Sequence, residues 1–72
     1  MNSLDLHGIK HIDVPRKVDE FIWDAMSSNK KEVEIITGLS EEMKKIVIST
    51  LNDYNLTCET DLLNKGKLLI KL

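Results

Sequence analysis

Aromatic residues are scarce in this chain, which holds one Trp, one Tyr and one Phe among its 72 residues. The core must therefore be built mainly from aliphatic side chains. Cys58 is the single cysteine, which excludes an internal disulfide and a multi-cysteine zinc site and favours a reducing, cytoplasmic setting. The apolar runs are too short for a signal peptide or a membrane span, so we expect no membrane partner.

The chain also lacks an excess of positive charge, because its formal net charge is −2. Dedicated nucleic-acid-binding domains are commonly basic, so any affinity for nucleic acid must come from a local patch. Internal repeats and low-complexity linkers are absent as well. A chain of this length buries only roughly 60% of the surface that its unfolded form exposes, so we expect one domain, residues 1–72, with a small core.

A short alternating segment stands near the start of the chain, Leu4-Asp5-Leu6-His7-Gly8. In a β-strand alternate side chains point to opposite faces, so Leu4 and Leu6 would enter the core while Asp5 and His7 lie outside, about 7 Å apart. Gly8 then permits a sharp turn where the strand ends. By spacing alone, this pair is either a solvated surface pair or part of a reactive site.

Two amphipathic helices are predicted farther along the chain. The first begins near Val14, with Asp13 as its N-cap and Pro15 in its first turn. Its apolar stripe consists of Val14, Val18, Phe21, Ile22 and Ala25. Trp23 lies about 180° from Val14 on the helical wheel and therefore points outward. Such a Trp is either an exposed rim residue or part of a contact with a partner or a second copy.

The second helix is expected to begin after Ser40, whose hydroxyl caps it, while Glu41 and Glu42 suit the positive end of the helix dipole. Its apolar stripe consists of Met43, Ile46, Val47, Leu51 and Tyr54. Together with the expected strands, the two stripes predict core positions at Val18, Phe21, Ile22, Ile35, Val47, Leu51 and Ile70.

Residues 32–37, 56–60 and 67–72 are predicted to be strands, the last two joined by a polar turn at Asn64-Lys65-Gly66. The order β-α-β-α-β-β predicts an α/β fold, an α+β sandwich with a mixed four-stranded sheet and both helices on one face. A right-handed crossover makes the first two strands parallel. It would bring His7-Gly8 and Thr37-Gly38 to the same edge of the sheet.

The segments Leu4-Asp5-Leu6-His7-Gly8 and Thr37-Gly38-Leu39-Ser40 resemble the two motifs of the small MutS-related (Smr) domain family, Leu-Asp-x-His-Gly and Thr-Gly-x-Gly. The first motif is complete, and the second has serine in place of its last glycine. Residues 64–70 are similar to the family's final hairpin strand. The chain looks like a minimal stand-alone member, which implies a fold similar to the C-terminal domain of translation initiation factor three.

The resemblance implies binding to nucleic acid, DNA or RNA, with endonuclease or nicking activity in some members. Asp5 would then hold a divalent metal, Mg²⁺ or Mn²⁺, or orient a water, and His7 would act as general acid or base. From the residues themselves, the turn 37–40 is a candidate anion site, because a helix start presents unpaired N–H groups and partial positive charge.

The residues expected to contact phosphate are Gly8, Lys10, His11, Thr37, Gly38, Leu39, Ser40, Lys44 and Lys67. Lys65 and Lys71 would add positive charge if the hairpin borders this edge, although surface lysines on small domains mostly serve solubility. The alternative function is a catalytically inactive protein-interaction or self-associating module on the same fold. The acidic balance, Ser40 and the outward Trp23 favour this alternative, in which Trp23 contacts a partner or a second copy.

Overall fold

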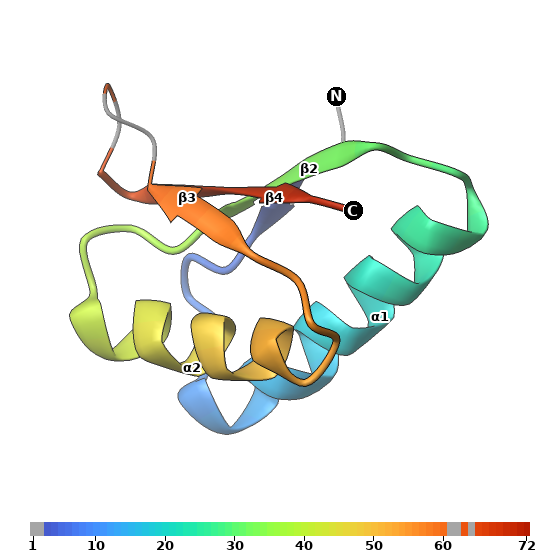
Figure 1. The fold of residues 1–72 in the computed structure, drawn as a ribbon. Coiled ribbons are helices and arrows are strands. Elements are labelled where there is room, and N and C mark those ends of the chain that lie inside the picture. Colours follow the sequence, from blue (N-terminus) through green and yellow to red (C-terminus); the bar gives the residue numbers. More distant parts are fainter. Residues whose placement is uncertain (1–2, 61–62, 64) are drawn as a thin grey trace.

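The computed structural model describes residues 3–60, 63 and 65–72 (Figure 1). The elements follow one another as β1 (Ser3–Asp5), the 3-10 turn η1 (His11–Asp13), α1 (Val14–Ser27), β2 (Glu32–Ile36), α2 (Glu41–Asn52), β3 (Cys58–Thr60) and β4 (Lys67–Lys71). The predicted order of strands and helices is therefore confirmed. Of the predicted hairpin turn, Asn64 lies outside the described residues.

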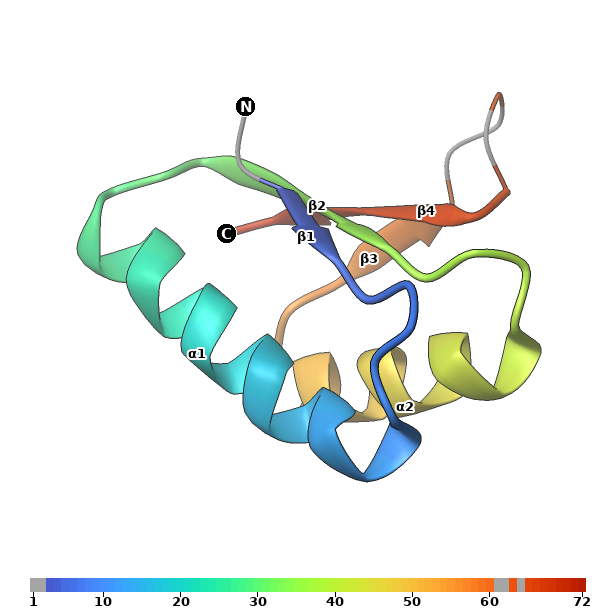
Figure 2. The same ribbon diagram turned by 180° about the vertical axis from the view of Figure 1, so that it is seen from behind.

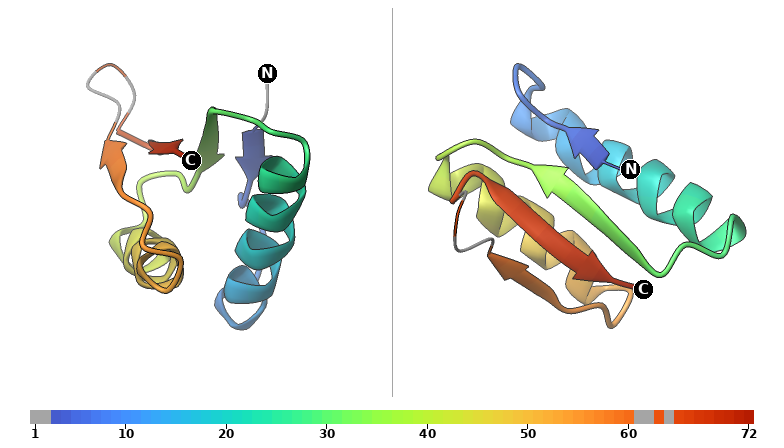
Figure 3. Two further views of the ribbon diagram at one scale, coloured as in Figure 1. Left: turned by 45° about the vertical axis from the view of Figure 1, so that its right-hand side comes forward. Right: turned by 90° about the horizontal axis from the view of Figure 1, so that it is seen from above.

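The strands form a mixed four-stranded sheet in the order β1-β2-β4-β3. β1 and β2 are parallel, whereas β4 is antiparallel to both β2 and β3. Both helices cover the same face, as predicted, with α1 below the β1 side and α2 below the β3 and β4 side (Figures 1 and 3). In the described part of the chain no helix covers the opposite face.

The core lies between the sheet and the two helices. It is aliphatic, and its buried apolar members are Leu6, Val14, Val18, Ile22, Ala25, Val33, Ile35, Met43, Val47, Leu51, Leu68 and Ile70. All predicted core positions are confirmed except Phe21, which is only half-buried and packs against the core from its margin. Phe21 lies at the edge of the apolar stripe of α1, so that the neighbouring polar face leaves part of its ring exposed.

The strands are shorter than predicted. β2 ends at Ile36 instead of Thr37, because the Thr37 N–H donates to the carbonyl of Gly66 outside the ladder, at 2.8 Å. β3 begins at Cys58 instead of Leu56, because the Leu56 N–H still closes the end of α2 by donating to Leu51, at 3.2 Å. β4 ends at Lys71, one residue before the predicted end.

The two predicted helix caps behave differently. Ser40 has an extended backbone, with φ −73° and ψ 113°, and its Oγ accepts the N–H of Met43 at 3.1 Å, so this cap is confirmed. Asp13 does occupy the N-cap position of α1, as predicted, but its side chain makes no capping hydrogen bond. The η1 turn already holds Asp13 in helical geometry, and its carboxylate lies 3.7 Å from the Arg16 guanidinium instead.

Candidate functional site

The ends of β1 and β2 lie side by side at one edge of the sheet. Asp5 is opposite Ile36, and the N–H of Leu6 donates to the Ile36 carbonyl at 2.9 Å. The two strands are parallel, so the loops that follow them leave the sheet in the same direction (Figure 2). The structure therefore brings His7-Gly8 and Thr37-Gly38 to one edge, as the sequence predicted.

The first loop is shaped by a side chain. The strand ends at Asp5, and the N–H of His7 donates to Asp5 Oδ1 at 2.9 Å, which closes a short turn. The Ile9 N–H donates to the Leu6 carbonyl at 3.0 Å, and Gly8 has a φ of +81°, which favours glycine. Asp5 and His7 are both exposed, as expected. His7 belongs to the turn and not to the strand.

The second loop is held from inside the protein. Thr37 is buried, and its hydroxyl lies 2.9 Å from the Gly38 carbonyl and 3.3 Å from the Gly66 carbonyl. The N–H groups of Thr37 and Gly38 both donate to Gly66, at 2.8 and 3.0 Å. Among the expected phosphate-binding residues, Thr37 thus has its hydroxyl and its N–H engaged within the protein.

Gly38 is glycine for a conformational reason. Its φ is +69°, a left-handed geometry that residues with a Cβ adopt at a cost, while a Cβ built there would meet nothing within 4 Å. The next residue, Leu39, is an exposed apolar side chain. The loop therefore presents an open backbone surface directly before the start of α2.

Ser40 explains the departure from the second motif. Its Oγ accepts the Met43 N–H, so the serine makes a capping hydrogen bond that a glycine at this position would lack. Helix starts carry N–H groups that have no partner within the helix, and they attract anions. Glu41 and Glu42 in the first turn of α2 place negative charge at the same point. A phosphate would have to compete with these carboxylates.

Three of the predicted basic ligands are paired with carboxylates. Lys44 Nζ lies 3.7 Å from Glu41, and His11 Nδ1 lies 3.7 Å from Glu42. Lys67 Nζ lies 3.3 Å from Glu34 Oε2. The remaining predicted or adjacent cations, Lys10, Lys65 and Lys71, are exposed.

Lys67 shares a face with the first motif. It lies opposite Ile36, which in turn lies opposite Asp5. Their neighbours Ile35 and Leu68 are buried beneath the sheet, so Asp5, Ile36 and Lys67 form a row on the face that the helices leave open. The open face thus carries a carboxylate and an ammonium group beside the edge that holds the two loops.

The side chains at this edge do not form a complete metal site by themselves. Among the residues that the structure describes, no group of three or more His, Cys, Asp or Glu side chains can hold a metal ion. One oxygen of Asp5 already accepts the His7 N–H. Mg²⁺ is usually bound through one or two carboxylates together with substrate phosphates and water. The chain would thus need a substrate to complete a site for Mg²⁺ or Mn²⁺.

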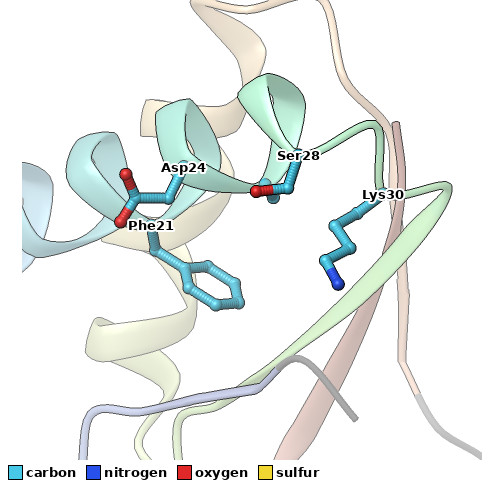
Figure 4. A pocket seen from close by; sticks show the side chains of 5 residues that line it. Phe21, Asp24, Ser28 and Lys30 are labelled. Atoms are coloured by element: carbon cyan, nitrogen blue, oxygen red, sulfur yellow. The ribbon is translucent and has the colours of Figure 1, made fainter.

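Two features were missed in the sequence. Gly66 was recognised only as part of a turn, because no local pattern marks the close approach of its backbone to Gly38. A hollow of about 210 Å³ beside α1 is lined by Phe21, Asp24, Ala25, Ser28 and Lys30. Figure 4 shows the Phe21 ring and the Lys30 side chain extending toward the same space.

The chain has a two-layer β-α-β-α-β-β fold in which the loops after β1 and β2 lie at one edge of the sheet. Comparison with known proteins identifies the domain family that has this fold. The family model of the Smr domain matches residues 4–60, and the chain belongs to this family. No curated protein matches the sequence significantly. Among the described residues, no helix is long and apolar enough to cross a membrane.

The fold is similar to a solved structure described as "Crystal structure of YdaL, a stand-alone small MutS-related protein from Escherichia coli". The TM-score is 0.75 at 23% sequence identity, and the similarity covers 97% of this chain. The chain spans 63% of the length of that protein. The likeness shows that this chain has the Smr fold.

Proposed function

We propose that this Smr domain binds nucleic acid, DNA or RNA, at the edge formed by His7-Gly8 and Thr37-Ser40. The observation that carries the proposal is the parallel pairing of β1 and β2, which places the two loops of the family motifs beside the start of α2. Backbone N–H groups and the dipole at a helix start suit a phosphate. The exposed Lys10 lies in the segment that follows the first loop.

The expected affinity is low. The edge also holds carboxylates at Asp5, Glu41 and Glu42, and two of its lysines, Lys44 and Lys67, already have acidic partners. A phosphate that binds Lys44 or Lys67 would therefore displace an existing ion pair. With about two to four phosphates neutralised, log K should fall with log salt at a slope of about −1.5 to −3.5, shallower than for strongly basic domains.

We infer that any cleavage of a phosphodiester at this edge uses Asp5 and His7. The exposed imidazole of His7 would take a proton from the attacking water or deliver one to the leaving oxygen as the P–O bond breaks. Asp5 accepts the His7 N–H through Oδ1 and so helps to hold the turn that carries His7, while its side chain is exposed. Mg²⁺ or Mn²⁺ is tested as an addition to the assay, because the described residues do not assemble a site without substrate.

A second candidate function is a protein-interaction or self-associating module. The observation that favours it is Trp23, whose side chain is 67% exposed on α1, with Met26 partly exposed one helical turn farther along. Trp and Met are enriched in protein interfaces. This face lies on the helical layer, whereas the motif loops lie at the sheet edge, so the two functions can be tested independently.

The experiment is binding and cleavage of labelled single-stranded and double-stranded DNA and RNA, with and without Mg²⁺ or Mn²⁺. Asp5→Asn should abolish cleavage and preserve or improve binding, because it removes a negative charge near the phosphates. Gly38→Val should weaken binding through its left-handed φ. Lys31→Gln, an exposed change just before β2, serves as a charge control at the opposite end of that strand.

Ser40→Gly restores the glycine of the family motif and costs only a few tenths of a kcal/mol, because glycine is tolerated at N-caps. If neither the wild type nor Ser40→Gly binds any of the four nucleic acids at low salt, where electrostatic contacts are strongest, the interaction-module function replaces the proposed one.

A further inference from the structure

We propose that Gly66, in the turn before β4, is a positioning residue for the Thr37-Ser40 loop, and that it determines which backbone N–H groups this loop offers to a ligand. The proposal rests on the proposed function for its effect on binding. It concerns a residue in the hairpin, 28 positions from Gly38 along the chain, which neither motif contains. Figure 3 shows the start of β4 beside the segment that follows β2.

The first argument is the hydrogen bonding of one carbonyl. The Gly66 oxygen accepts the N–H of Thr37 at 2.8 Å and the N–H of Gly38 at 3.0 Å. A carbonyl oxygen has two lone pairs, so these two donors saturate it, and the Thr37 hydroxyl at 3.3 Å is better placed for the Gly38 carbonyl at 2.9 Å. Both N–H groups of the Thr-Gly pair are therefore directed into the protein and away from any ligand.

The first two residues of the Thr37-Ser40 motif therefore have a different role from the residues that follow them. Thr37 and Gly38 anchor the loop, and the N–H groups that remain for a phosphate begin at Leu39 and continue into the first turn of α2. This changes the expected role of Thr37, which was predicted as a phosphate ligand. Its burial and its internal hydrogen bonds make it part of the anchor.

The second argument is steric. A Cβ built on Gly66 would lie 3.1 Å from Cα, 3.2 Å from the carbonyl carbon and 3.3 Å from the oxygen of Gly38. These contacts are tighter than nine in ten of the contacts that real Cβ atoms make, and the neighbouring atoms belong to backbone. Any side chain at position 66 therefore pushes on Gly38, whose φ of +69° sets the direction of the chain into Leu39 and Ser40.

The same residue also connects the hairpin to the open face. Lys67 follows Gly66 directly and is the first residue of β4, opposite Ile36. A shift at Gly66 would thus move the Thr37-Gly38 backbone and the start of Lys67 together. The hairpin therefore contributes to the site through the hydrogen bonds and the close backbone contact at Gly66, and not only through the charge of its lysines.

The test begins with the wild-type protein. Through-hydrogen-bond NMR couplings should connect the amide nitrogens of Thr37 and Gly38 to the carbonyl carbon of Gly66, and they should persist when an oligonucleotide is added. The amide signals of Leu39, Ser40 and Glu41 should shift in the same titration. Absence of the couplings overturns the proposal, as does their loss on binding.

The variant arm uses Gly66→Ala with Ile70→Val as a matched control, because Ile70 is buried in β4, the strand that follows Gly66, away from the loop. Gly66→Ala should speed hydrogen exchange at the Gly38 amide roughly tenfold, and weaken oligonucleotide binding roughly threefold or more, at a temperature where it is fully folded. Ile70→Val should lower the melting temperature without either local effect.

The outcomes separate the two proposals. If the wild type binds no oligonucleotide, the proposed function fails, while the couplings and the exchange at Gly38 still decide whether Gly66 positions the loop. If Gly66→Ala binds as tightly as the wild type and protects Gly38 equally, the positioning role is refuted. If Gly66→Ala fails to fold, the wild-type couplings decide the question.

Discussion

The carboxylate of Asp5 accepts the backbone N–H of His7, with 2.9 Å between Oδ1 and the nitrogen. The first motif therefore contains its own internal support, in which the acid holds the turn that carries the imidazole. The carboxylate keeps further acceptor capacity beyond this hydrogen bond. Asp5 thus joins a structural role to the proposed catalytic one, and these roles can be separated by substitution.

Asp5→Asn and Asp5→Ala should differ in stability. The Asn side chain keeps an oxygen that can accept the His7 N–H, whereas Ala removes it at a cost of about 0.5–1.5 kcal/mol. Urea denaturation should place Asp5→Asn near the wild type and Asp5→Ala below it. Equal stabilities for the two variants would show that the turn does not depend on this hydrogen bond.

Truncation of the core should have a graded cost. Ile22 is fully buried, so Ile22→Ala should lower the free energy of unfolding by about 2–5 kcal/mol, a large fraction of the stability of so small a protein. Phe21→Ala should cost less, because Phe21 is half-buried beside the hollow and leaves no closed cavity. Thermal unfolding followed by circular dichroism measures both, and a larger loss for Phe21→Ala would contradict the placement of the core.

Tyr54 and Asp19 should make stability depend on alkaline pH. The Tyr54 hydroxyl donates to Asp19 at 2.9 Å, and this hydrogen bond, followed by burial and nearby negative charge, raises the pKa of Tyr54 above its ordinary value of 10.0. Folding therefore favours the protonated phenol, and this stabilisation is present below pH 10 and lost as pH rises through the raised pKa. Tyr54→Phe lacks this loss.

The stability of Tyr54→Phe and the wild type should thus converge as pH rises from 8 to 11 in urea denaturation. All other ionisable groups are the same in both proteins, so the comparison isolates the phenol. Parallel pH profiles for the two proteins would show that the Asp19 contact does not form in solution.

Trp23 should be accessible in the free protein. Its side chain is 67% exposed, which confirms the position expected from the helical wheel, so acrylamide should quench its fluorescence efficiently. If the α1 face self-associates, acrylamide quenching should decrease as the protein concentration rises. Trp23→Ala should then remove the association without lowering the melting temperature. Concentration-independent quenching together with a monomer in sedimentation would exclude the self-associating module.

The features that the sequence predicted correctly are those set by local patterns. Val18 and Ile22 on one stripe, the Ser40 cap and the outward Trp23 depend on spacing within a single helix. The parallel pairing of the first two strands follows from the handedness of the crossover. The meeting of the two loops at one edge was therefore predictable.

The features that were missed depend on contacts between distant segments. The register between β2 and β4 determines two of these contacts, and no local pattern encodes it. They are the ion pair of Lys67 with Glu34 and the hydrogen bonds of Thr37 and Gly38 to the Gly66 carbonyl. The Asp13 side chain does not cap α1 because the η1 turn precedes the helix and gives that residue helical backbone geometry. Phe21 was predicted to be a core residue but is only half-buried, because its exposure depends on which segments lie beside α1.

The measurement that tests the central claim most directly is an NMR titration of the ¹⁵N-labelled protein with short single-stranded and double-stranded oligonucleotides at low salt. We predict that the amide signals of His7, Gly8 and residues 39–41 shift with a common saturation curve, while those around Trp23 stay unchanged. Shifts confined to the Trp23 face, or none with any oligonucleotide, would contradict the assignment of this edge as a nucleic-acid site.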